Sequence, residues 1–249
     1  MIENNSKAFR LNSLHCLYDQ KEISHFSPDM LSAEYWQIKN AITGSAQGRG
    51  TTWFIGVEHN SMPTQHWVLR HYYRGGLIGK IINDSYLYTG IKNTRAAKEY
   101  DLLHYMNNMG LPAPKPIAYR VTRHGLFYKA DLLSSRINKA ADLVDILTKN
   151  TITDAQWNNI GATIKRFHDQ AIYHHDLNAH NILINDEGEV FLIDFDRGEV
   201  RTDKAEDVRW KQQNMVRLER SFLKEQKKLS QFHFNNDNWL QLLAGYTSE

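Results

Sequence analysis

The sequence predicts an α+β protein of two lobes, an antiparallel β-rich first lobe and a mainly helical second lobe. Between residues 41 and 131, runs of β-branched and aromatic residues alternate with turn-forming segments, which is typical of strands. From residue 132 to residue 249, apolar residues recur at helical spacing. The clearest stripe consists of Trp157, Ile160, Ile164 and Phe167. We therefore expect residues 41–131 to form the β-rich lobe and residues 132–249 the helical lobe.

Composition limits the class of protein. The 249 residues carry a formal net charge of +2, so the overall charge does not indicate a nucleic-acid partner. The single cysteine, Cys16, excludes an intrachain disulfide. No apolar run approaches the ~18 residues of a membrane span, and Met1–Asn5 does not resemble the start of a signal peptide. We expect a cytoplasmic protein, and no protein partner is indicated.

Residues 1–40 are polar with scattered aromatic residues and carry no recognisable chemistry. Ser32 is a candidate cap for a short helix over residues 32–37. We expect this segment to be an extension that packs on the β-rich lobe.

Two carboxylates and one amide mark the candidate catalytic region. Residues 174–181 read His-His-Asp-Leu-Asn-Ala-His-Asn, which places Asp176 five positions before Asn181. After a hairpin signal at residues 185–188, a second apolar run ends at Asp194, in the sequence Asp-Phe-Asp. The order matches the kinase catalytic loop His-x-Asp-x-x-x-x-Asn and the following Asp-Phe-Gly.

This match predicts a protein-kinase-like fold and phosphoryl transfer from ATP. Asp176 is the candidate group beside the acceptor hydroxyl, and Asn181 and Asp194 are candidate ligands of Mg²⁺ on the nucleotide. An Asp at a strand end and an Asn in a turn also serve as ordinary caps. The rest of the chain therefore has to supply the other parts of a kinase.

A glycine-rich segment at residues 44–52 is the candidate phosphate-binding loop. Glycines and small residues before a β-rich run predict a hairpin whose backbone N–H groups cover the phosphates of ATP. The spacing is not Gly-x-Gly-x-x-Gly, so by itself the segment fits a plain flexible turn better. The catalytic motifs downstream favour the phosphate loop. The candidate nucleotide-binding residues here are Gly48, Arg49, Gly50 and Thr51.

Two cations compete for the role of the kinase lysine. Arg70 follows Val68 and Leu69 on a predicted strand, although a planar guanidinium is not equivalent to an ammonium group. Lys80, after a basic glycine-rich loop, is the alternative, and a solvated surface charge fits either cation. Glu99 lies midway along a predicted helix over residues 94–106, and we expect it to orient Arg70 for catalysis.

The segment Lys129–Leu132 is the candidate hinge, in which the backbone groups of Lys129 and Asp131 bind adenine. Helices are expected over residues 140–147, 154–170 and 206–232. Thr153 and Gln156 have the spacing of a capping box, and His168 is expected to be a buried support. The last helix has an excess of Lys and Arg between residues 209 and 228, which fits a solvated face or a contact with anionic lipid headgroups.

With these residues in view, the chain resembles the bacterial 3-deoxy-D-manno-octulosonic acid (Kdo) kinases of lipopolysaccharide assembly. The resemblance is almost full length, and its most specific parts are the Arg-Gly-Gly loop at residues 74–76 and the His-Asp-Leu-Asn-Ala-His-Asn run at residues 175–181. It implies ATP, Mg²⁺ and phosphorylation of a hydroxyl of Kdo on a lipid A precursor. An enzyme acting on that glycolipid is expected at an anionic membrane surface, peripheral on the cytoplasmic face of the bacterial inner membrane.

Departures from the protein-kinase pattern bear on the acceptor. His175 and Asn178 replace the usual Arg and Lys around the catalytic Asp, and no Ala-Pro-Glu follows Asp194. These departures disfavour a protein acceptor and favour a small molecule or glycolipid. Two alternatives stay open: another small-molecule phosphotransferase, similar to antibiotic or choline kinases, and an inactive kinase-like scaffold.

Overall fold

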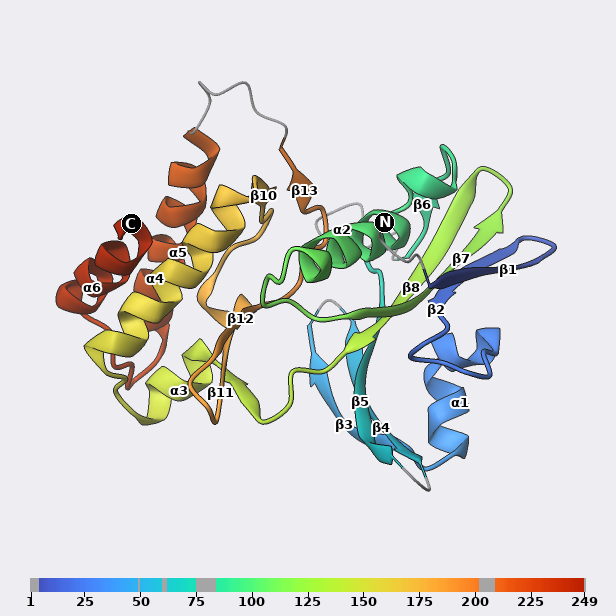
Figure 1. The fold of residues 1–249 in the computed structure, drawn as a ribbon, viewed down its shortest axis with the longest axis horizontal. Coiled ribbons are helices and arrows are strands. Elements are labelled where there is room, and N and C mark those ends of the chain that lie inside the picture. Colours follow the sequence, from blue (N-terminus) through green and yellow to red (C-terminus); the bar gives the residue numbers. More distant parts are fainter. Residues whose placement is uncertain (1–4, 49, 60–61, 75–83, 202–208, 249) are drawn as a thin grey trace. The chain divides into compact units, whose positions relative to one another are not determined.

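The computed structural model describes residues 5–48, 50–59, 62–74, 84–201 and 209–248 (Figure 1). The chain forms two compact units. Unit 1 comprises Met1–Asn108 and Pro114–Arg136, and unit 2 comprises Met109–Ala113 and Ile137–Glu249. The described residues contain a large antiparallel sheet and six α-helices, which confirms the α+β class. The chain leaves unit 1 after Arg136, so the boundary expected at residue 131 falls inside a strand.

Unit 1 is built on an eight-stranded sheet with the order β1-β2-β7-β8-β5-β4-β3, in which β6 also pairs with β8. The strands are β1 (Ser6–Leu11), β2 (Leu14–Asp19), β3 (Ile42–Gln47), β4 (Thr51–His59), β5 (Met62–His71), β6 (Tyr86–Leu87), β7 (Pro116–His124) and β8 (Phe127–Ser135). The helices are η1 (Pro28–Leu31), α1 (Ala33–Ile38), η3 (Ile91–Asn93) and α2 (Arg95–Asn108). All of the strand pairs are antiparallel, and most neighbours in the sheet are also neighbours in sequence.

The first strands belong to the sheet itself and are not an extension packed on it. Cys16 of β2 is paired with Arg120 of β7, and β1 forms the free edge beyond β2. Four of the six residues of β1 are exposed, so β1 carries little of the apolar alternation that indicates a strand. This exposure explains why the sequence of residues 1–40 predicts an extension and not two strands of the sheet.

Side chains alternate between the two faces of the sheet along β5. Trp67 and Leu69 belong to an apolar core that includes Trp36 of α1, and the Trp36 and Trp67 rings meet edge to face with centroids 5.8 Å apart. Arg70 and Tyr72 instead contact α2, as described below. One strand therefore supplies an apolar core on one face and a charged side chain on the other.

Unit 2 is mainly helical with two small sheets. Its helices are α3 (Leu143–Lys149), α4 (Asp154–Asp169), η4 (Ala179–Asn181), α5 (Arg209–Lys228) and α6 (Asn236–Thr247). One sheet has the order β12-β11-β9, and β10 pairs with β13. These strands are β9 (Ala140–Asp142), β10 (Ile172–Tyr173), β11 (Ile182–Asn185), β12 (Val190–Leu192) and β13 (Glu199–Val200).

The predicted capping box of α4 is confirmed. The Thr153 hydroxyl accepts a hydrogen bond from the Gln156 N–H at 3.2 Å, and the Gln156 side chain accepts one from the Thr153 N–H at 2.9 Å. The apolar stripe of α4 is buried as expected. α4 packs closely on α6, because a Cβ at Gly161 would lie 1.9 Å from the Leu242 carbonyl oxygen.

Two predicted helices are wrong at their ends. Residues 140–142 form β9 and pair with β11, and Asp142 then caps α3 by accepting a hydrogen bond from the Asp145 N–H at 3.0 Å. α5 ends at Lys228, whereas the apolar residues up to Phe232 predict a longer helix. Phe234 turns back to stack on Phe222, with ring centroids 4.6 Å apart, so apolar residues after α5 serve the core without continuing the helix.

Candidate active site

Both backbone polar groups of Asp176 are held in the loop between β10 and β11. Its N–H donates to His174 Nδ1 at 3.2 Å, and its carbonyl oxygen accepts from the Nδ2 atoms of Asn178 and Asn181 at 3.0 and 2.9 Å. The side chain of Asp176 remains 46% exposed. The loop thus combines a fixed backbone with an accessible carboxylate, which suits contact with a substrate hydroxyl.

Asn181 and the residues before Asp194 are joined by a backbone hydrogen bond. The Ile193 N–H donates to the Asn181 carbonyl oxygen at 3.0 Å, which holds the start of the Asp194 segment against the catalytic loop. Asn181 is buried and donates through its amide nitrogen to Asp176, so its side-chain oxygen is the only side-chain atom that could bind a cation. Asp194 has φ of 62°, a left-handed conformation that is uncommon for a residue with a Cβ and that concentrates at functional sites.

His174 connects these two segments through its ring. Nδ1 accepts from the Asp176 N–H, and Nε2 lies 2.9 Å from the carbonyl oxygen of Ile193. A carbonyl oxygen only accepts, so Nε2 carries the proton and Nδ1 does not. Burial lowers the pKa of His174, which keeps this neutral ring dominant at neutral pH. The ring also packs on Phe195, with centroids 4.7 Å apart.

One face of α5 contacts the catalytic loop residue by residue. The contacts are Asn214 Nδ2 to the His174 carbonyl oxygen at 3.0 Å, Arg217 Nη1 to Asp176 Oδ1 at 3.5 Å, the Ala179 N–H to Ser221 Oγ at 2.9 Å, and His180 Nε2 to Glu225 Oε1 at 3.8 Å. These α5 residues are three, four and four positions apart, so they share one helical face. The sequence prediction missed this role, although polar residues at helical spacing beside the apolar stripe of α5 are a visible signal.

His168 supports the same helix, as expected. It is buried, and its ring nitrogens contact the Tyr246 hydroxyl at 2.7 Å and Asn214 Oδ1 at 3.4 Å. Burial lowers the pKa of His168 to about 4, so the ring is neutral at neutral pH. A chain of polar contacts therefore runs from α4 through Asn214 to the carbonyl of His174.

In unit 1, Arg70 of β5 pairs with Glu99 of α2. Arg70 Nη2 lies 2.5 Å from both carboxylate oxygens, and the Tyr72 hydroxyl donates to Glu99 Oε2 at 2.6 Å. Glu99 is 4% exposed and Arg70 is 24% exposed, so the carboxylate is the buried anchor and the guanidinium is the accessible partner. Burial, followed by the Glu99 carboxylate, raises the pKa of Tyr72, which therefore remains a donor. The expected pair is present, and Lys80, the alternative cation, lies outside the described residues.

The glycine-rich hairpin is formed by β3 and β4. The Gly48 N–H donates to the Gly50 carbonyl oxygen at 3.0 Å, and Thr51 exchanges side-chain hydrogen bonds with Gln47. A Cβ at Gly50 would lie 2.0 Å from the ring of Tyr73, so a side chain at this position displaces that ring. Arg49 lies outside the described residues. The contact of this loop with phosphate stays a prediction.

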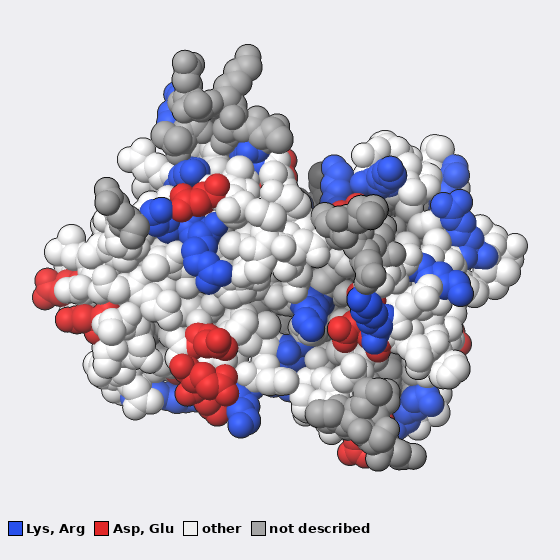
Figure 2. Space-filling model, in the orientation of Figure 1, with Lys and Arg blue, Asp and Glu red and all other residues white. Residues whose placement is uncertain are grey.

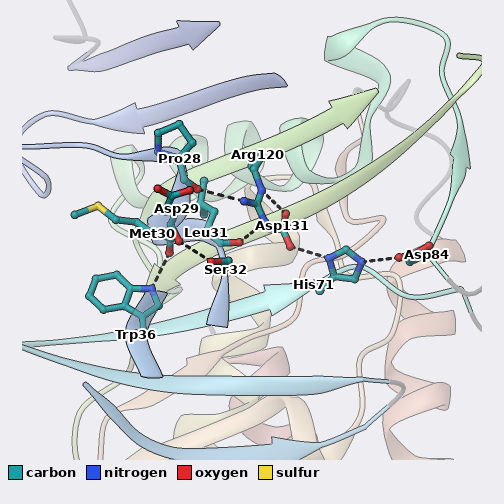
Figure 3. A network of polar contacts seen from close by, with 10 residues as sticks. All are labelled: Pro28, Asp29, Met30, Leu31, Ser32, Trp36, His71, Asp84, Arg120 and Asp131. Carbon is teal, nitrogen blue, oxygen red and sulfur yellow. Dashed lines mark hydrogen bonds and ion pairs between the residues drawn. The ribbon is translucent and has the colours of Figure 1, made fainter. Parts of the chain in front are cut away.

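Asp131 lies in a polar network on the face of the sheet opposite α2 (Figure 3). Its carboxylate lies 2.7 Å from His71 Nδ1 and accepts from Arg120 Nε at 2.8 Å. Arg120 also donates to the carbonyl oxygens of Pro28 and Leu31, at 3.3 and 2.5 Å, which ties η1 to the sheet. The network therefore stabilises the fold of unit 1.

The prediction that Lys129 and Asp131 belong to an adenine-binding hinge is wrong. β8 continues to Ser135, and it pairs Lys129 with Thr122 and Asp131 with Arg120 on β7, so this backbone belongs to the sheet. The Lys129 ammonium group binds Asp84 at 2.7 Å. The apolar run of β8 is interrupted by polar residues that belong to this network. In the sequence, such an interruption resembles the end of a strand.

Comparison with known proteins identifies the family. Residues 33–246 match the Lipopolysaccharide kinase (Kdo/WaaP) family. The chain belongs to this family. It is therefore a kinase, as the catalytic-loop motifs predict.

Relatives named 3-deoxy-D-manno-octulosonic acid kinase match most of the kinase chain. The protein of Photobacterium profundum is 45% identical over 229 residues, which cover 89% of this chain and 93% of the relative. The protein of Mannheimia succiniciproducens is 46% identical over 216 residues, with 85% and 87% covered. The protein of Vibrio cholerae is 47% identical over 192 residues, with 77% and 78% covered.

We expect the His71 network to make stability depend on pH. Burial opposes the charged form of His71, but the carboxylates of Asp131 and Asp84 outweigh it and raise the pKa of His71. A raised pKa in the folded state gives stabilisation that is complete below the unfolded value of about 6.5 and is lost as pH rises through the folded value. Urea unfolding should therefore give a lower free energy at about pH 8.5 than at about pH 6.

The substitution His71→Gln should remove this part of the pH dependence. His124→Gln, at the exposed end of β7, is the matched control and should retain it. If the unfolding free energies of wild type and His71→Gln changed in parallel with pH, the network would not be the source.

Proposed function

We propose that this kinase transfers the γ-phosphate of ATP to a hydroxyl of Kdo attached to a lipid A precursor, a step of lipopolysaccharide assembly. The observation that carries the proposal is the catalytic loop, in which Asp176 has a fixed backbone and an accessible carboxylate. The relatives named Kdo kinases, which align over most of the chain, support the choice of acceptor.

In this proposal Asp176 orients the acceptor hydroxyl and accepts its proton. The carboxylate can do so because its backbone is held by three hydrogen bonds and its side chain is accessible. A group positioned in this way contributes roughly 10²–10⁴ in rate.

We assign Asn181 and Asp194 to Mg²⁺. Both offer oxygen atoms, which Mg²⁺ prefers, and this ion is commonly held by one or two protein groups together with phosphates and water. The described residues contain no group of three or more His, Cys, Asp or Glu side chains arranged to hold a metal. When bound, Mg²⁺ neutralises charge on the phosphate oxygens.

We assign unit 1 to nucleotide binding and unit 2 to catalysis, as the two lobes of a protein-kinase-like fold. Arg70 contacts a phosphate in this proposal, because Glu99 orients its guanidinium and the Arg70 side chain is 24% exposed. The backbone of Gly48, Gly50 and Thr51 covers the phosphates, and Arg49 belongs to the same loop.

Substitution of the two carboxylates separates their roles. Asp176→Asn should abolish phosphoryl transfer and leave ATP affinity nearly unchanged.

Asp194→Asn should weaken both Mg²⁺·ATP binding and turnover, because an amide replaces a carboxylate on the metal. The assay incubates enzyme with ATP and Kdo-bearing lipid A precursor and detects the added phosphate by mass.

The same assay tests the acceptor. A lipid A precursor without Kdo, an aminoglycoside and choline are the comparison acceptors. Phosphorylation of the Kdo-bearing lipid alone is the expected result. Wild-type enzyme that phosphorylates only an amino sugar or choline would assign it to a different class of phosphotransferase, and full turnover by Asp176→Asn would remove Asp176 from the mechanism.

We further propose that α5 brings the enzyme to the anionic cytoplasmic face of the inner membrane, where its lipid acceptor lies. None of the helices in the described parts of the chain is long and apolar enough to cross a bilayer. On the face drawn in Figure 2, cations and carboxylates are interspersed. Attraction of the enzyme to anionic lipid therefore has to come from a local group of cations. Every exposed charged side chain of α5 is a cation, because Glu219 is half-buried and Glu225 is buried. Each surface cation near anionic lipid contributes about 1 kcal/mol.

Binding to vesicles tests this placement. We expect co-sedimentation with anionic vesicles that falls as salt rises, and a further loss when Lys224, Lys227 and Lys228 are changed together to Gln. The matched control changes the exposed lysines of unit 1, Lys7, Lys92 and Lys98, to Gln. Equal binding to neutral and anionic vesicles, or equal losses in the two triple variants, would show that α5 is only a solvated surface.

A further inference from the structure

Arg217 of α5 lies beside the carboxylate of Asp176. Its Nη1 atom is 3.5 Å from Asp176 Oδ1, and the two side chains are 49% and 46% exposed. Charge-assisted hydrogen bonds between such groups are usually about 2.7–2.9 Å long, so this contact is loose. Arg217 makes no other ion pair or hydrogen bond with the described residues. Most of the donors of its guanidinium are therefore available to a ligand.

The position of Arg217 is set by the helix that carries it. Asn214 and Ser221, on the same face of α5, hydrogen-bond to the backbone of the catalytic loop on either side of Asp176. The guanidinium is thus presented by a fixed element to the space around the Asp176 carboxylate. Because the two side chains approach to 3.5 Å, an anion on Arg217 and a hydroxyl at Asp176 would be neighbours on one ligand.

Stability does not account for this arrangement. A half-exposed pair at this distance contributes little, because exposed ion pairs are typically worth about 0–1 kcal/mol. The guanidinium is held loosely and keeps open donors, which suits it to binding a ligand beside Asp176.

We propose that Arg217 binds the carboxylate of the acceptor sugar and thereby places the hydroxyl of that sugar at Asp176. The proposed acceptor is a sugar acid, so its sugar carries a carboxylate at neutral pH. The planar fork of arginine matches a carboxylate through two parallel hydrogen bonds, which fixes orientation as well as position. The inference rests on the proposed function and adds the residue that recognises the acid.

The test compares two acceptors in detergent micelles. One is lipid A precursor carrying a single Kdo, and the other is the same lipid with the Kdo carboxylate converted to a carboxamide. Wild-type enzyme should show a KM for the amide roughly 10- to 100-fold higher than for the acid, the range expected for loss of a hydrogen-bonded charged partner. Arg217→Gln should raise the KM of the acid towards that of the amide, and leave the KM of the amide and of ATP unchanged.

Two further variants make the comparison specific. Arg217→Lys keeps the charge without the planar fork, and it should retain part of the preference for the acid. Arg220→Gln removes an exposed cation one turn along α5 that makes no hydrogen bond or ion pair with the described residues, and it should leave the preference intact. Thermal unfolding of each variant shows that the fold is kept.

The outcomes separate this inference from the proposed function. If wild type phosphorylates neither lipid, the proposed function fails. Wild-type enzyme that uses acid and amide with the same KM overturns the role of Arg217 without any variant. A loss in Arg217→Gln that is equal for acid and amide also overturns it, because the guanidinium would then act only through Asp176.

Discussion

The neutral ring of His174 is the constraint on which the catalytic unit depends. Its unprotonated Nδ1 accepts from the backbone of Asp176, and its protonated Nε2 donates to the residue before Asp194. Protonation would place a second donor against the Asp176 N–H and leave that N–H without its acceptor. Burial lowers the pKa of His174 and so protects both contacts. The segments that carry Asp176 and Asp194, the two carboxylates of the proposed mechanism, are therefore held by one ring.

The same principle, a buried partner that orients an accessible group, recurs in both units. Glu99 is buried and holds the more exposed guanidinium of Arg70. Asn214 is buried and holds the carbonyl of His174, while Arg217 on the same face of α5 remains half exposed. Because the anchors lose their contact with water on folding, they need a definite partner, and that partner fixes the orientation of the functional group. The accessible group is left to meet a ligand.

The sequence alone predicts the features that depend on local spacing. The capping box at Thr153 and Gln156, the hairpin after Asn181 and the pairing of Arg70 with Glu99 all follow from fixed offsets or from a recognised motif. It does not predict features that depend on distant residues. Asp131 resembles a strand end because its partners, His71 and Arg120, are far away in the chain. The polar face of α5 is likewise meaningful only when it lies against the catalytic loop.

Nitrogen-15 NMR of the His174 imidazole tests this account most directly. In protein with labelled histidine, we expect a neutral ring with its proton on Nε2 at neutral pH, because burial lowers the pKa of His174 below its ordinary value of about 6.5. The exposed His124 provides the reference signal within the same sample. A His174 ring that titrates near its ordinary pKa, or that carries its proton on Nδ1, would contradict the claim that this neutral side chain holds the catalytic segments together.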